Sequence, residues 1–176
     1  IEDATSISVA LSASDSDGAI VSYTINSLPA NGTLYSDSSL TTIVGAGDTV
    51  TGAMLYFVPN ADWNGSTSLV FSANDNEGTA SPAVTQGISV LAVNDAPVAP
   101  GVVVNAIEEG PDVAISLSSP PFDIDSPSLT IRVAQLPTLG SVMLVAGGIE
   151  TPLFTGQSLA AADFANLVYR PPQDYT

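Results

Sequence analysis

Residues 55–63 read Leu-Tyr-Phe-Val-Pro-Asn-Ala-Asp-Trp, and residues 167–175 read Leu-Val-Tyr-Arg-Pro-Pro-Gln-Asp-Tyr. The two segments share their order of apolar, proline, acidic and aromatic positions and lie 167 − 55 = 112 residues apart. A second pair, Leu-Pro-Ala-Asn-Gly-Thr-Leu at 28–34 and Leu-Pro-Thr-Leu-Gly-Ser-Val at 136–142, lies 136 − 28 = 108 residues apart. Recurrence at nearly one period indicates tandem structural repeats. We therefore interpret the 176-residue chain as two copies of one module of about 100 residues.

Two short acidic segments recur in the same order. Ile-Glu-Asp at 1–3 returns as Ile-Glu-Glu at 107–109, and Asp-Ser-Asp at 15–17 returns as Asp-Ile-Asp at 123–125. The small drift in spacing indicates insertions, which surface loops tolerate. We place the first copy at 1–97, leaving open whether its first strand is present, and the second at 98–176. On this alignment the second copy stops before its last two strands, the counterparts of those near 69–73 and 88–93. We expect either that the sequence was cut at this point or that another chain supplies the missing strands.

Apolar and polar residues alternate over short runs, which is the pattern of half-buried β-strands. Runs of this kind occupy residues 7–12, 21–25 and 69–73, and clusters of Gly, Asn and Asp separate the runs at 14–18, 30–32, 60–65 and 74–78. The sequence therefore predicts an all-β fold of antiparallel sandwiches. The one helical element that we expect is a single turn within the Ala-rich residues 158–165, leading into a strand at 167–170.

The chain is strongly acidic. It has 18 Asp and Glu residues against two Arg, with no Lys or His, so its net charge is −16. Such a surface repels nucleic acid and anionic membranes and attracts cations. No run approaches the roughly 18 apolar residues of a membrane span. We therefore expect neither a nucleic-acid partner nor direct insertion into a membrane.

The same composition argues against an enzyme. Without His, Lys or Cys, the usual general base, Schiff-base lysine and thiolate nucleophile are missing. A pair of carboxylates remains possible in principle, as in glycosidases. The acidic clusters lie at turns, however, where Asp is first of all a turn former. We therefore predict no catalytic residues, and the absence of Cys also excludes disulfide bonds.

Five short motifs follow one another along the chain. They are Asp-x-Asp at 15–17, Pro-x-x-Gly-x-Leu at 29–34, Tyr-x-x-Pro-Asn-x-Asp-Trp-Asn-Gly at 56–65, Phe-x-Ala-x-Asp-x-x-Gly at 71–78 and Val-Asn-Asp-Ala-Pro at 93–97. In this order they resemble the cadherin-like or bacterial Ig-like tandem repeats of very large extracellular adhesins of the RTX type. The resemblance implies Greek-key β-sandwiches strung end to end at a cell surface, with calcium stiffening their junctions. One departure is Arg170, which stands where the first copy has Val58.

Calcium takes roughly six to eight oxygen ligands, and a junction can draw them from one module, the linker and the next module. The resemblance implies that the junction ligands of this chain are Glu2, Asp62, Asn94, Asp95, Asp123 and Asp125. By the same correspondence Asp15, Asp17 and Asp75 belong to a preceding junction, and Glu108 and Asp174 to a following one. For the Asp residues beside Gly or Asn, the alternative is a side chain that caps a turn and binds nothing.

Three roles stay open at this stage. In the first, the modules are non-enzymatic spacers or adhesion modules of a large surface protein, and their partners are neighbouring repeats. In the second, they are protomers of an extracellular filament, in which strands from a neighbouring copy complete the second sandwich. The third, a carbohydrate-binding sandwich, lacks an obvious row of exposed aromatic residues.

Overall fold

The computed structural model describes residues 1–173. The fold is nearly all-β, with 39% of residues in strands and 3% in helix, which confirms the all-β prediction. Two compact units form, Ile1–Val93 and Asn94–Thr176, and are called unit 1 and unit 2 below. Their boundary lies a few residues before the one placed at 97 and 98 from the repeats. No helix in the described part of the chain is long and apolar enough to span a membrane.

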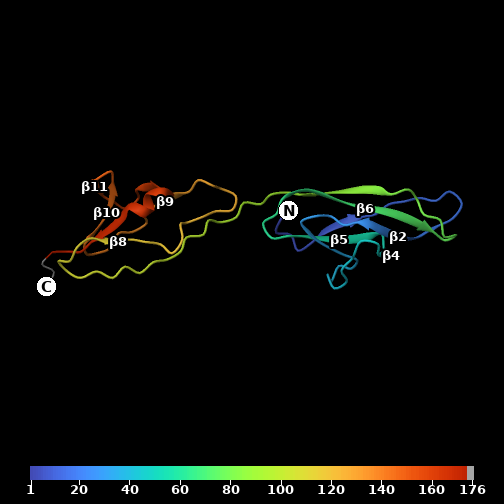
Figure 1. Cartoon of the computed structure of the whole chain (residues 1–176), viewed down its shortest axis with the longest axis horizontal. Helices are drawn as coiled ribbons and strands as arrows, with labels where there is room; N and C mark the ends of the chain where they lie inside the picture. Colours follow the sequence, from blue (N-terminus) through green and yellow to red (C-terminus); the bar gives the residue numbers. More distant parts are fainter. Residues whose placement is uncertain (174–176) are drawn as a thin grey trace. The chain divides into compact units, whose positions relative to one another are not determined.

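Unit 1 consists of two antiparallel sheets (Figure 1). Its strands are β1 (Ile7–Ala10), β2 (Ile20–Ser27), β3 (Gly32–Tyr35), β4 (Thr49–Val50), β5 (Met54–Pro59), β6 (Gly65–Asp75) and β7 (Val84–Val90). One sheet has the order β1-β5-β3 and the other has the order β4-β2-β6-β7. Strands adjacent in space are therefore often distant in sequence.

The core of unit 1 lies between these sheets. Phe57 and Leu55 from one sheet meet Ile25 and Leu69 from the other, and all four side chains are fully buried. Around each of these residues buried and less buried positions alternate along the strand, so each strand turns one face inward. Burial of side chains of this size stabilises the fold by about 1.5–3 kcal/mol each. Trp63 packs against the edge of this cluster.

The glycine of the recurring Pro-x-x-Gly segment is explained by a close approach between strands. A Cβ on Gly32 would lie 2.3 Å from the carbonyl oxygen of Val58 and 2.5 Å from the ring of Phe57. A Cβ on Gly140, which has φ +70°, would lie 2.4 Å from the carbonyl oxygen of Arg170. Both distances are far below van der Waals contact, so only glycine lets the neighbouring strand approach this closely.

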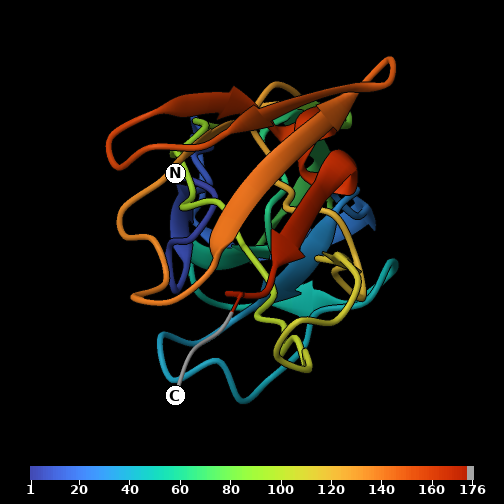
Figure 2. The ribbon, with the colours of Figure 1, turned by 90° about the vertical axis from the view of Figure 1, so that its left-hand side faces the viewer.

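Unit 2 contains further antiparallel strands and a short 3-10 helix. These elements are β8 (Val113–Ala114), β9 (Thr130–Arg132), β10 (Ser141–Ala146), β11 (Ile149–Pro152), β12 (Ser158–Ala160), η1 (Ala161–Asn166) and β13 (Leu167–Arg170). The sheets have the orders β11-β10-β13-β8 and β12-β9. Figure 2 shows β10 between β11 and β13.

Strand pairs in unit 1 have counterparts in unit 2 at the spacings seen in the sequence. The pairing of Ile7 with Phe57 corresponds to that of Val113 with Tyr169. The pairing of Leu34 with Phe57 corresponds to that of Val142 with Tyr169. The pairing of Tyr23 with Val50 corresponds to that of Ile131 with Leu159. Thus β8, β9, β10, β12 and β13 take the places of β1, β2, β3, β4 and β5. Within the described residues of unit 2, no strand takes the place of β6 or β7.

The Ala-rich stretch near residue 160 is only partly as predicted. The expected helical turn is present as η1, and the strand after it is β13. The prediction of a turn from residue 158 onward was wrong at its start, because Ser158–Ala160 forms strand β12. This segment has no β-branched or aromatic residue, so its strand depends on pairing with β9 and not on local propensity.

Arg170 stands out because it replaces the apolar Val58 of unit 1. Its guanidinium donates two hydrogen bonds to the carboxylate of Asp112, at 2.9 and 2.6 Å, and one to Glu150 at 2.7 Å. The hydrogen bonds and charge of Arg170 lower the pKa of Asp112. Because these side chains are exposed to solvent, the ion pairs contribute little to stability. The substituted position therefore carries a cross-strand ion pair.

Candidate metal centre

Glu2 is the buried carboxylate of unit 1, with 3% of its surface exposed. Its Oε1 accepts a hydrogen bond from the backbone N–H of Val93 at 2.5 Å, and its Oε2 accepts one from the Asn64 side chain at 3.0 Å. The Glu2 N–H also donates to the carbonyl oxygen of Leu91 at 3.0 Å. These contacts hold the start of the chain against the end of unit 1.

The hydrogen bonds from Val93 and Asn64 lower the pKa of Glu2 from its ordinary value of 4.5. A carboxyl whose pKa is depressed by folding stabilises the fold above its unfolded pKa and loses that contribution as pH falls through the folded value. We therefore expect the melting temperature of wild-type unit 1 to exceed that of the Glu2→Gln variant at pH 7, and this difference to shrink below about pH 4.5.

The measurement is Trp63 fluorescence during heating, from about pH 7 to about pH 3. Trp63 is the single Trp of the chain, so its signal reports on unit 1. The matched control is Glu77→Gln, which removes one charge at an exposed turn. A difference between wild type and Glu2→Gln that stays constant over this pH range would contradict the role assigned to Glu2.

Asp3 and Asp62 form a second acidic pair in unit 1. One carboxylate oxygen of each lies within 4.8 Å of the other, and both residues are exposed. Asp62 lies in the turn before Trp63 and has φ +58°, so the chain reverses there through a left-handed backbone conformation. Asp62 was predicted from the sequence, whereas Asp3 and Asn64 were not. Asp3 could have been predicted as a site residue from its position directly after Glu2. Asn64 could have been predicted from its place in the 60–65 turn, which also holds Asp62.

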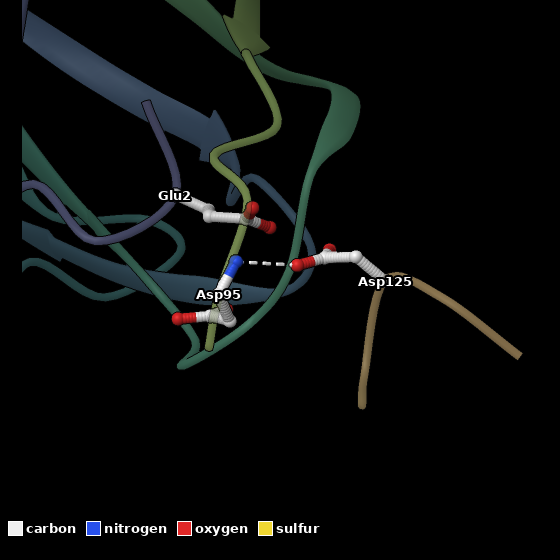
Figure 3. A group of neighbouring side chains, drawn as sticks. All are labelled: Glu2, Asp95 and Asp125. Carbon is white, nitrogen blue, oxygen red and sulfur yellow. Dashed lines mark hydrogen bonds between the residues drawn. The ribbon is translucent and has the colours of Figure 1, made fainter. Parts of the chain in front are cut away.

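Unit 2 presents Asp95 and Asp125 together. The backbone N–H of Asp95 donates to Oδ2 of Asp125 at 2.6 Å (Figure 3), and carboxylate oxygens of the two residues lie within 4.8 Å. Asp123 Oδ1 accepts the N–H groups of Asp125 and Ser126, both at 2.9 Å, and so fixes the loop that carries Asp125. The Asn94 side chain donates to the carbonyl oxygen of Asp95 at 2.7 Å.

The residues predicted for a preceding junction lie at the other end of β6 from Asn64. Oδ1 of Asp75 accepts N–H groups from Glu77 and Thr79, both at 2.8 Å, and these bonds lower its pKa. Asp15 Oδ1 accepts the N–H of Asp17 at 3.4 Å. These geometries are those of carboxylates that stabilise turns. Asp15 and Asp75 nevertheless line one shallow pocket of about 160 Å³.

Of the two residues predicted for a following junction, the structure describes only Glu108. Glu108 is exposed beside a depression lined also by Tyr169 and Pro172. Asp174 lies outside the described residues. The prediction for this junction is therefore left untested.

The donors near residues 93–95 suit a hard cation. They are carboxylate, amide and carbonyl oxygens, which calcium prefers, and the chain has no Cys or His to favour a softer metal. Each acidic pair also brings two negative charges together, and a bound cation would relieve that repulsion. By the chemistry of its donors, this set fits calcium.

Comparisons of the chain with protein-family models, with curated proteins and with solved structures find no match.

Proposed function

We propose that this chain is a non-enzymatic structural repeat of a large extracellular surface protein, a spacer or adhesion module whose linker is stiffened by calcium. Two observations support a repeat: the recurring segments and the matching strand pairs of the two units. The absence of His, Lys and Cys supports a role without catalysis. The acidic surface suits an extracellular setting, where millimolar-range calcium modules operate.

The main support for the calcium proposal is that two carboxylates, those of Glu2 and Asp125, accept hydrogen bonds from the backbone N–H groups on either side of Asn94. Val93, the last residue of unit 1, donates to Glu2, and Asp95, the second residue of unit 2, donates to Asp125. Each unit thus ties one of its own carboxylates to the linker backbone. We propose that Glu2, Asp3 and Asp62, the linker residues Asn94 and Asp95, and Asp123 and Asp125 supply oxygen ligands to one site.

Bound calcium would neutralise part of the negative charge of these residues and hold the linker in one conformation. A spacer needs this property, because a flexible linker lets successive modules reorient, whereas a rigid one transmits their direction. Without the ion, mutual repulsion of the carboxylates opposes close approach of the same groups. The proposal therefore predicts that calcium changes the relative motion of the units.

The experiment measures backbone ¹⁵N relaxation of the whole chain in calcium and in chelator at equal ionic strength. We expect the amides of both units to share one rotational correlation time in calcium, and to show shorter and separate values in chelator. Asp125→Asn keeps an acceptor for the Asp95 N–H and should weaken the calcium effect, whereas the control Glu77→Gln should retain it. If the correlation times of the two units are the same in calcium as in chelator, the result would contradict the proposal.

A further inference from the structure

The dipeptide Asn-Gly occurs twice in the chain, at residues 31–32 and 64–65. An asparagine in this position can react with its own main chain, because the glycine that follows has no Cβ to keep its backbone nitrogen away from Cγ of the asparagine. The reaction requires an asparagine side chain that can turn and a glycine N–H that is not held by a neighbouring strand. Both asparagines are exposed, so access to water does not distinguish them. Their hydrogen bonds do.

Asn64 is held in both respects. Its side chain donates a hydrogen bond to Oε2 of Glu2 at 3.0 Å. Gly65 begins strand β6 and is paired with β7. Ala73, further along the same strand, bonds through both its N–H and its carbonyl oxygen to Ser81, in the connection to β7. Because N–H groups point to opposite edges at successive residues, Gly65 directs its N–H toward β7 as Ala73 does.

Asn31 lacks both restraints. In the described part of the chain its side chain takes part in no hydrogen bond. Its carbonyl oxygen accepts the N–H of Asn60, which follows β5, at 2.9 Å. The carbonyl oxygen of Leu34 accepts the N–H of Val44 at 2.9 Å on the other side of β3. Gly32 alternates with Asn31 and shares the orientation of Leu34, so its N–H points away from β5. Since β3 is the edge strand of its sheet, this N–H points outward from the sheet.

We propose that Asn31 is a site of spontaneous deamidation and that the fold protects Asn64 from the same reaction. The deprotonated backbone nitrogen of Gly32 attacks Cγ of Asn31 and forms a new C–N bond. The bond from Cγ to the side-chain nitrogen breaks, and ammonia leaves with the proton that Gly32 lost. Water then opens the resulting succinimide ring at either carbonyl, which gives aspartate or isoaspartate. No oxidant or reductant takes part, and the chain gains one negative charge.

Isoaspartate would change the fold where β3 begins. Its main chain runs through Cγ, which adds one methylene before Gly32 and moves the carbonyl group that accepts the Asn60 N–H. Little room is available there, because even a Cβ on Gly32 would lie 2.3 Å from the carbonyl oxygen of Val58. We therefore expect conversion to isoaspartate to weaken the pairing of β3 with β5.

The test incubates the whole chain at mildly alkaline pH, where more of the backbone amide is deprotonated. Samples are digested with pepsin in acid, which stops the reaction, and tandem mass spectrometry measures the mass gain of each asparagine. We expect Asn31 to convert about ten times faster than Asn64 or more, because the Asn64 side chain must first leave a charged acceptor. The control is the same chain unfolded in guanidinium chloride, in which the two rates should become similar.

Three outcomes would overturn the proposal. The first is conversion of Asn64 in the folded chain at the same rate as Asn31 or faster. The second is no conversion of Asn31 in the folded chain over a period in which both asparagines convert in the unfolded chain. The third is an equal ratio of the two rates in the folded and the unfolded chain, which would assign the difference to the neighbouring sequence and not to the fold.

Discussion

Replacing Phe57 with alanine is expected to lower the free energy of unfolding of unit 1 by about 3–5 kcal/mol. The Phe57 side chain is fully buried in β5, the central strand of its sheet, and it lies close to Gly32 of β3. Truncation removes the burial of the ring and leaves a cavity that neighbours from both sheets cannot fill without moving. The measurement is urea unfolding followed by the fluorescence of Trp63, which packs on the same core.

The matched control is Met54→Ala in the same strand. Met54 is 43% exposed, so its truncation should cost less than about 1 kcal/mol. Because side chains alternate between faces, a shift of β5 by one residue would reverse which positions are buried. A larger loss for Met54→Ala than for Phe57→Ala would therefore contradict the described register of β5 against β1 and β3.

The strands that the sequence predicted most directly are those with clear alternation or a repeated copy. The two recurring segments cover most of β5 and all of β13, and the alternating runs at 21–25 and 69–73 lie within β2 and β6. The spacing of the recurring segments also matches the strand pairs of the two units. In such segments local pattern and tertiary pairing agree, so the sequence alone suffices.

Two strands of unit 2 escaped prediction for different reasons. Strand β12 has a helix-favouring composition, and only its pairing with β9 makes it a strand. Strand β11 follows the turn Gly147-Gly148, where both residues have positive φ. A Gly-Gly pair between apolar runs is a hairpin signal, so β11 was predictable from its turn.

The acidic residues of the candidate site could be predicted from the sequence, but the groups that hydrogen-bond to them and hold them in place could not. Glu2, Asp95 and Asp125 were identified through a resemblance to adhesin repeats, which stays a prediction. Asn64 was missed because its contact with Glu2 spans 62 residues and depends on the shape of a turn. Similarly, the use of Asp123 to fix the Asp125 loop follows from backbone geometry that no spacing rule specifies.

Calcium is expected to raise the melting temperature of unit 1 in the whole chain. A ligand that binds only the folded state at a hundred times its dissociation constant stabilises that state by about 2.7 kcal/mol. For a domain of about 100 residues this corresponds to a rise of about 10–20 °C. Glu2→Gln should reduce the rise, because it removes a carboxylate of the proposed site, and Glu77→Gln should not.

Asp125→Asn gives the sharpest comparison, because Asp125 belongs to unit 2 whereas Trp63 reports on unit 1. If both units supply ligands to one ion, removing the Asp125 charge must reduce the calcium-induced rise that Trp63 reports. The most direct test of the account is therefore the Trp63 melting curve of the wild type and of Asp125→Asn, each in millimolar calcium and in chelator at equal ionic strength. We predict a large calcium-dependent rise in the wild type and a much smaller one in the variant. Wild-type curves that coincide in calcium and in chelator would contradict the account.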